Sequence, residues 1–308
     1  MAISNYGIPY LGSKAKEIER FGFVFPNADH FYDLFGGGFA VSHYMIQRRS
    51  KDYKHFHFNE FRQGVCELIQ NAIAGKFSYP EFKMPWVSRE EFEKTKDTNA
   101  FNRIIWSFGN NGKEYLFGKD IEDYKKSLHQ AVVFDEFDKT AKYFLGINRW
   151  PEGTSIYKKR IFLQHRARYL VMALEKGQLQ QLQQLQQLER LQQLQQLERL
   201  QQLERLSFYN ADYRQVPILP NSVIYCDIPY RGTADYGTEF NHEEFYDWAA
   251  ARPEPVFVSE YEINDTRFHL IMEWSTKSRL SPKCQTNSRE RLYGNNAARK
   301  AVPGPETV

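Results

Sequence analysis

Cysteine is scarce in this chain of 308 residues, which has three of them, Cys66, Cys226 and Cys284. None belongs to a Cys-x-x-Cys pair. Their number and spacing argue against a disulfide framework and against a Cys-rich zinc site, the two structures that cysteine patterns usually mark. We expect a fold held together by a buried core, and a functional site that needs no metal.

Long apolar runs are missing as well, because no stretch approaches the roughly 20 residues of a membrane span. The N-terminal residues lack the basic-then-apolar pattern of a signal peptide. Hydrophobic residues make up 42% of the chain and aromatic residues 16%, which indicates globular structure. We therefore expect a soluble cytoplasmic protein of one large or two medium domains. The net charge of +3 is mildly basic and compatible with nucleic acid without indicating it.

The chain has neither a GxGxxG fingerprint nor a P-loop lysine, yet one segment has the order of a ligand-binding βα unit. Residues 30–35 read as a strand, Gly36–Gly38 as a turn and residues 39–48 as a helix. Such a turn lets backbone approach a ligand. A second strand, residues 53–60, ends at Glu60, where α/β folds bind a ribose diol. A tight turn and an exposed glutamate are the alternatives, but together the two features favour a nucleoside cofactor.

The most informative stretch is a strand that ends at Asp227-Ile-Pro-Tyr230. Val223, Ile224 and Tyr225 are the β-branched and aromatic residues that a central parallel strand needs. Ligands of open α/β sheets bind at the carboxyl ends of the strands. A carboxylate, a free carbonyl at residue 228 and an aromatic ring could together hold an exocyclic amine on a planar base. An ordinary strand end followed by a turn is the alternative.

The composition changes between residues 76 and 177, where loops and short helices replace strands. Residues 121–137 and 155–174 are predicted helices. The second of these is rich in basic residues beside aromatic ones, a combination that suits a phosphate backbone. A solvated helix face is the alternative. The candidate nucleic-acid-binding residues are Lys158, Lys159, Arg160, Arg166 and Arg168.

Residues 178–206 repeat Leu-Gln-Gln and Leu-Glu-Arg triplets, with leucine at every third position from Leu179 to Leu206. This period does not fit a heptad, so a coiled coil is not indicated. A step of three keeps leucines on one face of a 3₁₀-helix but spirals them around an α-helix. Three readings remain, in order of preference: a 3₁₀ rod, an α-helical arm that self-associates, and a partly disordered spacer.

Taken in order, these segments resemble the phage-type members of the Dam-like class of DNA N6-adenine methyltransferases. The resemblance covers about residues 5–75 and 207–293 and is absent from the leucine triplets. The matching segments are Pro9–Lys14, Asp33–Phe39, Asn59–Glu60, Ala211–Tyr213 and Asp227–Tyr230, followed by Val258–Tyr261 and Arg289–Leu292.

The resemblance implies an α/β, Rossmann-like methyltransferase sheet with an inserted, mostly helical domain that recognises double-stranded DNA. Residues 1–75 and 207–308 would form the catalytic domain, 76–177 the insert and 178–206 a separate arm. If the chain is phage-encoded, the host bacterial cytoplasm is its compartment. The residues implied around the cofactor, S-adenosylmethionine, are Tyr10, Lys14, Asp33, Phe35, Gly36, Gly38, Glu60 and Asp212. Those implied around the target base are Asp227, Ile228, Pro229 and Tyr230.

One departure from the family pattern concerns residue 228, because the usual motif is Asp-Pro-Pro-Tyr. The family uses the main-chain carbonyl at this position, which isoleucine retains, although isoleucine restricts φ less than proline. Two other functions fit the motif. One is methylation of another planar amine, such as RNA adenine or protein glutamine. The other is a non-catalytic DNA-binding or assembly protein with a decayed site.

Overall fold

The computed structural model describes residues 6–174, 185–200, 203–231, 240–281 and 284–302. The chain divides into two compact units. The sheet unit consists mainly of Gly12–Glu67 and Arg199–Val308, and the helical unit mainly of Leu68–Glu198, to which the short segment Pro9–Leu11 also belongs. The predicted triplet arm therefore belongs to the helical unit as far as Glu198.

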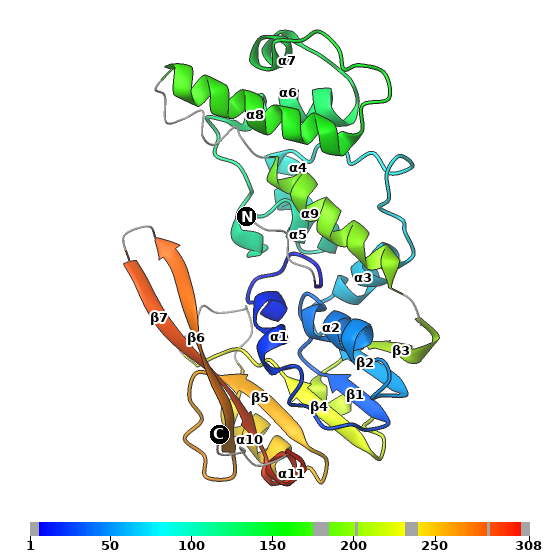
Figure 1. Cartoon of the computed structure of the whole chain (residues 1–308), viewed down its shortest axis with the longest axis vertical. Helices are drawn as coiled ribbons and strands as arrows, with labels where there is room; N and C mark the ends of the chain where they lie inside the picture. Colours follow the sequence, from blue (N-terminus) through cyan, green and yellow to red (C-terminus); the bar gives the residue numbers. More distant parts are fainter. Residues whose placement is uncertain (1–5, 175–184, 201–202, 232–239, 282–283, 303–308) are drawn as a thin grey trace. The chain divides into compact units, whose positions relative to one another are not determined.

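The sheet unit contains seven strands in the order β3-β2-β1-β4-β5-β7-β6 (Figure 1). The first five strands in this order are parallel to one another, and β7 is antiparallel to both β5 and β6. This arrangement confirms the predicted α/β, Rossmann-like class. The strands are β1 (His30–Asp33), β2 (His55–Asn59), β3 (Leu206–Tyr209), β4 (Ser222–Cys226), β5 (Val256–Glu260), β6 (His269–Ser281) and β7 (Cys284–Gly294).

Successive side chains of each strand point to opposite faces of the sheet, so apolar residues form a core on both faces. On β1, Phe31 packs against Phe25, while the next residue, Tyr32, faces the opposite side. Every residue of β4 is buried, as expected for a central parallel strand. The helices of this unit are α1 (Ile18–Phe21), α2 (Ala40–Arg48), α10 (His242–Ala250) and α11 (Asn296–Ala301), with short 3₁₀ turns η1 (Lys14–Lys16), η5 (Leu203–Arg205) and η6 (Tyr213–Gln215).

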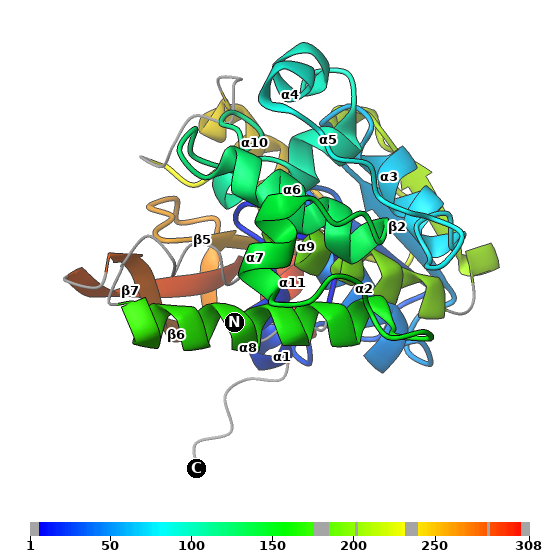
Figure 2. The same cartoon turned by 90° about the horizontal axis from the view of Figure 1, so that it is seen from above.

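The helical unit is built from short helices and one long one, α8, which lies beside α6 and α7 (Figure 2). Asp138 caps the start of α7 by accepting a hydrogen bond from the Ala141 amide (2.7 Å), and Gly146, at φ +70°, ends it. Helix α3 (Val65–Ile73) crosses the boundary between the units. The other helices are α4 (Arg89–Thr95), α5 (Ala100–Ile105), α6 (Glu122–Val133), α7 (Lys139–Leu145), α8 (Ile156–Leu174) and α9 (Gln186–Gln195), with 3₁₀ turns η2 (Phe108–Asn110) and η4 (Gln196–Arg199).

The leucine triplets differ from the preferred prediction. The described part, residues 185–200, forms the α-helix α9 and then η4, so a continuous 3₁₀ rod is wrong for this segment. Residues 178–184 lie outside the described part of the chain. The leucines of α9 are buried, and so are Gln187 and Arg190. Arg190 donates hydrogen bonds to the carbonyls of Ile105 (2.7 Å) and Ser107 (2.6 Å). The described triplets are therefore a core element of the helical unit and not an arm.

No helix in the described part of the chain is long and apolar enough to cross a membrane.

Candidate active site

Acidic residues gather at the carboxyl edge of the sheet because three parallel strands end there. Strand β1 ends at Asp33, β2 is followed by Glu60 and β4 by Asp227. In a parallel sheet the carboxyl ends of neighbouring strands lie at one edge, which is where ligands of open α/β sheets bind. The predicted cofactor and base-binding residues of the sheet unit thus converge at one place.

The glycine turn joins β1 to Glu60. Gly37, at φ +48°, donates its amide to the Glu60 carboxylate (2.8 Å), and Gly36 donates to the carbonyl of Asn59 (2.9 Å). A Cβ on Gly36 would lie 2.0 Å from the Phe58 ring, which real side chains do not tolerate. The carbonyl of Gly38 accepts from the Ile8 amide at 2.8 Å. The turn needs Gly36 for this close packing, and it contacts Glu60 at the place where the sequence predicts a nucleoside cofactor.

Asp33 is a buried carboxylate with one oxygen tied down. Its Oδ2 accepts hydrogen bonds from the Ser42 amide (3.2 Å) and hydroxyl (2.8 Å), and the side chain is 1% exposed. Oδ1 is buried and has no hydrogen-bond partner among the described residues. Burial is the largest cause that raises the pKa of Asp33 to about 7, and the negative charges of Asp227 and Glu60 also raise it. The hydrogen bonds from Ser42 lower the pKa but do not cancel these effects. Such a carboxylate is suited to receive a cation.

Asn59 holds three strand ends together. Its side-chain amide donates to the carbonyls of Leu34 (2.9 Å) and Ala211 (3.0 Å), and its carbonyl oxygen accepts from the Ala211 amide (3.1 Å). Sequence reasoning noted Asn59 only as a neighbour of Glu60. The available signal was an amide placed where a buried strand ends, since a buried amide must find such partners.

The remaining predicted cofactor residues have different surroundings. The Asp212 carboxylate accepts two bonds from the Arg214 guanidinium (2.8 and 2.7 Å), which hold its pKa below the usual range. The Phe35 ring contacts the rings of Tyr213 and Phe245, and thereby anchors the glycine turn to an aromatic cluster. Tyr10 belongs to the short segment that groups with the helical unit, so its role stays a prediction.

Lys14 is paired with the predicted catalytic carboxylate. Its Nζ lies 2.9 Å from Asp227 Oδ1 and 3.9 Å from Glu290, and 4.7 Å from the centre of the Tyr230 ring. Burial alone would lower the pKa of Lys14, but Asp227, Tyr230 and Glu290 outweigh it and raise it well above the usual value. Burial raises the pKa of Asp227, and Lys14 opposes that shift. Lys14 therefore favours the charged form of the Asp227 carboxylate.

Two side chains outside the Asp227–Tyr230 turn hold it: His242, which no sequence motif marks, and Glu260, from the matching segment Val258–Tyr261. His242 Nε2 donates to the carbonyl of Pro229 (2.8 Å), and Glu260 accepts from the amide of Arg231 (3.2 Å). The Ile228 side chain is 2% exposed and belongs to the apolar cluster around α10. An isoleucine at this position gains packing in exchange for the φ restriction of a proline. The Ile228 side chain thus anchors the turn in the core.

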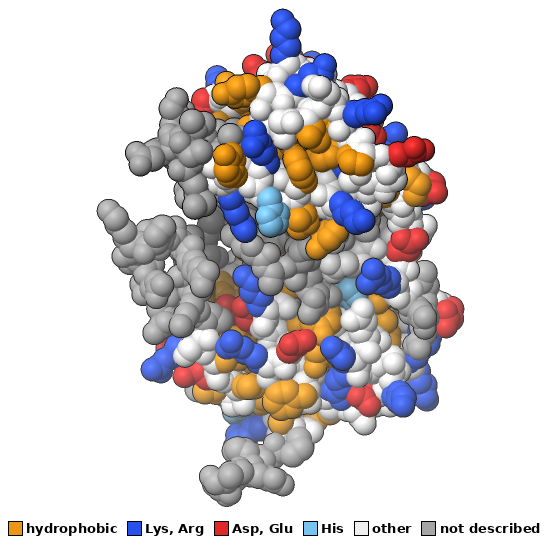
Figure 3. Space-filling model, turned by 45° about the horizontal axis from the view of Figure 1, so that its top comes forward, with side chains coloured by type: hydrophobic (Ala, Val, Ile, Leu, Met, Phe, Trp, Pro, Cys, Tyr) orange, Lys and Arg blue, Asp and Glu red, His pale blue; other side chains and the backbone are white. Residues whose placement is uncertain are grey.

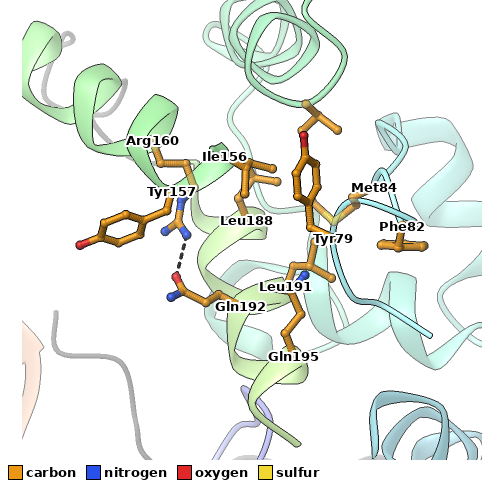
Figure 4. Close-up of a pocket in the computed structure, with 11 residues that line it drawn as sticks. Tyr79, Phe82, Met84, Ile156, Tyr157, Arg160, Leu188, Leu191, Gln192 and Gln195 are labelled. Atoms are coloured by element: carbon orange, nitrogen blue, oxygen red, sulfur yellow. Dashed lines mark hydrogen bonds between the residues drawn. The ribbon is translucent and has the colours of Figure 1, made fainter. Parts of the chain in front are cut away.

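The five basic residues predicted to bind nucleic acid do not form one face, which corrects that prediction. Lys158, Lys159 and Arg160 are consecutive and point in different directions, because each helical residue turns the side chain by about 100°. Lys159 is buried and pairs with Asp135 (2.5 Å). Arg160 turns inwards to Gln192 (2.8 Å) beside a cavity of about 110 Å³ (Figure 4). Arg166 donates to the Phe144 carbonyl at 3.0 Å. Lys158 and Arg168 are exposed.

Comparison with known proteins found no matching family model and no matching curated protein. Two solved structures of the rRNA methyltransferase AviRa from Streptomyces viridochromogenes, at 1.5 and 2.4 Å, were found. They have TM-scores of 0.35 and 0.33 and sequence identities of 8% and 9% to this chain. Each match covers 98% of this chain and 94% of the other. The function has to be argued from the site itself.

Proposed function

We propose that the chain transfers a methyl group from S-adenosylmethionine to N6 of an adenine extruded from duplex DNA. The observation that carries the proposal is the placement of Asp227. The Asp227 carboxylate is 19% exposed and follows the central strand β4, beside the Tyr230 ring, at the sheet edge where β1 ends at Asp33 and Glu60 follows β2. The proposal also draws on the sequence resemblance, which supplies the choice of adenine and of duplex DNA.

The cofactor side of the site would be formed by the glycine turn and its acidic neighbours. Asp33 Oδ1 would accept from the cofactor's ammonium group, since it is the buried oxygen that lacks a hydrogen-bond partner among the described residues. Glu60 would accept from the ribose hydroxyls, because it follows β2 at the ligand-binding edge of the sheet and contacts the glycine turn through the Gly37 amide (2.8 Å). Phe61, which is 63% exposed beside Glu60, offers a flat face to the adenine ring near Asp212.

The chemistry requires orientation more than a strong base. The N6 lone pair of adenine is delocalised into the ring, so the amine is a poor nucleophile. When bound, the cofactor supplies an electrophilic methyl group. Asp227 and the carbonyl of Ile228 would accept both N–H bonds and favour a tetrahedral nitrogen. The Lys14 ammonium, 2.9 Å from Asp227 Oδ1, favours the ionised form of that carboxyl. Tyr230 would stack on the extruded base, offsetting part of an extrusion cost of a few kcal/mol.

Sequencing of modified bases tests the proposal most directly. DNA from a host that lacks adenine methylation, expressing this chain, should carry N6-methyladenine in one recurring sequence context. The same host expressing Asp227→Asn should carry none. Unmodified DNA together with transfer of labelled methyl groups to RNA or protein would move the substrate to another planar amine. The absence of any transfer together with absent cofactor binding would overturn the proposal.

The pKa of Asp33 predicts how cofactor affinity changes with pH. An ionised Asp33 binds the ammonium group, and its pKa of about 7 means that it takes up a proton below neutral pH. The dissociation constant should therefore rise about tenfold for each pH unit below about 7, because one proton must then be displaced. Calorimetric titration of the full chain with the cofactor between about pH 5 and pH 8 measures this slope.

The control for this titration is Glu260, another buried carboxyl whose pKa burial raises to about 7. Asp33→Asn should bind the cofactor more weakly and with little pH dependence in the acidic range, whereas Glu260→Gln should keep the wild-type slope. A wild-type slope in Asp33→Asn would show that Asp33 does not receive the ammonium group.

A further inference from the structure

One side of helix α8 exposes a row of aromatic and basic side chains. The exposed residues are Tyr157, Lys158, Phe162, His165, Arg168 and Tyr169. At about 100° per residue these six side chains span about 140° of the helix circumference, so they share one broad side of α8, called the stripe below. Leu163 and Ala167 are buried, so the other side of the helix packs into the helical unit. Tyr157 is 59% exposed, Phe162 39% and Tyr169 62%. Large rings gathered in water on one stripe indicate an interaction surface.

Neighbouring side chains support two of these rings. The Trp150 ring meets Phe162 edge to face, with ring centres 5.5 Å apart. The Arg166 guanidinium lies 5.4 Å from the centre of the Tyr169 ring and is itself fixed by the Phe144 carbonyl. Both rings are therefore held in place before any partner binds, which reduces the entropy lost on binding.

The charge of this stripe favours a polyanion. Helix α8 contains no acidic residue. The nearby acids Asp135 and Glu189 are paired with Lys159 and Arg160, at 2.5 and 3.5 Å. Lys158 and Arg168 are exposed on the stripe, separated by about 15 Å at 1.5 Å per residue. In Figure 3, lysine and arginine side chains lie among hydrophobic ones on the visible face of the helical unit.

We infer that the exposed stripe of α8 binds unpaired bases of a single-stranded nucleic acid segment. A duplex presents phosphates outward and keeps its bases stacked, so it would use the two cations and leave the rings in water. An unpaired strand uses both, because its bases stack on aromatic faces while its phosphates meet Lys158 and Arg168. The rings follow one another by five and seven residues, or about 7.5 and 10.5 Å along the helix, which is open enough for separate bases. The inference rests on the proposed function only in taking nucleic acid as the substrate class.

Fluorescence anisotropy of the full chain tests the inference with a labelled oligothymidine strand and the same strand paired to oligoadenosine. Tyr157→Ala, Phe162→Ala and Tyr169→Ala should each weaken binding of the single strand at least about tenfold. Their affinity for the duplex should change less than about twofold. Tyr143→Ala is the matched control, because Tyr143 is 82% exposed on α7 and not on the stripe. Lys158→Ala and Arg168→Ala should weaken binding of both the single strand and the duplex. Each should lower the slope of log affinity against log salt concentration by about one.

Three results would overturn the inference: unchanged single-strand binding in all three ring variants, an equal loss for single strand and duplex, or loss of binding in Tyr143→Ala. Self-association that Phe162→Ala abolishes, in a chain that does not bind the strand, would assign the stripe to a second copy and also overturn it. The single-strand assay contains neither cofactor nor adenine. If methylation fails but the ring variants lose single-strand binding, only the proposed function is contradicted. If methylation succeeds but the ring variants bind the single strand like the wild type, only this inference is contradicted.

Discussion

Replacing Asp227 with asparagine is expected to abolish methyl transfer, with a loss of at least about 10²- to 10³-fold in rate. The carboxylate is the charged acceptor at the end of β4, and an amide there offers a weaker acceptor and brings a competing donor. Cofactor affinity should change little, because the glycine turn, Asp33 and Glu60 remain. Rates from labelled cofactor and affinities from calorimetry measure the two effects separately.

The control for this substitution has to account for the buried partner. Removing the charge of Asp227 leaves Lys14, which is 8% exposed, without its ion pair at 2.9 Å. A broken buried pair costs about 3–5 kcal/mol, which could unfold the site and imitate a catalytic effect. Lys14→Met combined with Asp227→Leu removes both charges and should recover stability while staying inactive. Asp247→Asn, on the exposed side of α10, should behave as wild type. Full activity in Asp227→Asn would refute the catalytic assignment.

Local patterns in the sequence predicted the parts of the site that neighbouring residues build. Gly36 to Gly38 and Glu60 were expected together, and the Gly37 amide does bond the Glu60 carboxylate. The reason is that a strand, a turn and the next strand of a βα unit have a fixed spatial relation. The buried strand before Asp227 could also be predicted, because its apolar residues point to both faces of the sheet and all of them are buried.

Contacts between distant segments could not be predicted in the same way. Lys14 was assigned to the cofactor by resemblance, whereas the structure pairs it with Asp227 from the other end of the chain. His242 holds the Asp227–Tyr230 turn from α10, and no motif marks it. Glu260 lies in the matching segment Val258–Tyr261, but its contact with the Arg231 amide cannot be read from that segment. Pairings of this kind depend on which side chains the finished fold brings within 3 Å.

The leucine triplets show how a correct periodicity argument can lead to an incorrect preference. A step of three does rotate leucines around an α-helix, by about 60° per step. That spiral disfavours an α-helix only where one side of the helix faces water. The structure places leucines of α9 against neighbours on several sides, and even Gln187 and Arg190 are buried. For an embedded helix, leucines on several sides are an advantage.

Leu194→Ala is therefore expected to destabilise the helical unit by about 2–5 kcal/mol, the usual cost of emptying a buried leucine site. Leu194 is 0% exposed within α9. Urea unfolding of the full chain, with hydrogen exchange followed in peptides from α5 and α9, measures the loss where it occurs.

The neighbouring Gln193→Ala is the matched control, since it makes the same helix-favouring replacement at a partly exposed position. It should leave stability within about 0.5 kcal/mol. The comparison discriminates between the readings of the repeat. In a solvated spacer or a free arm, both substitutions would be neutral or slightly favourable, because alanine is the better helix former. Equal stability of the two variants would show that the triplets act as a linker. A loss of stability confined to Leu194→Ala would show that α9 is part of the core.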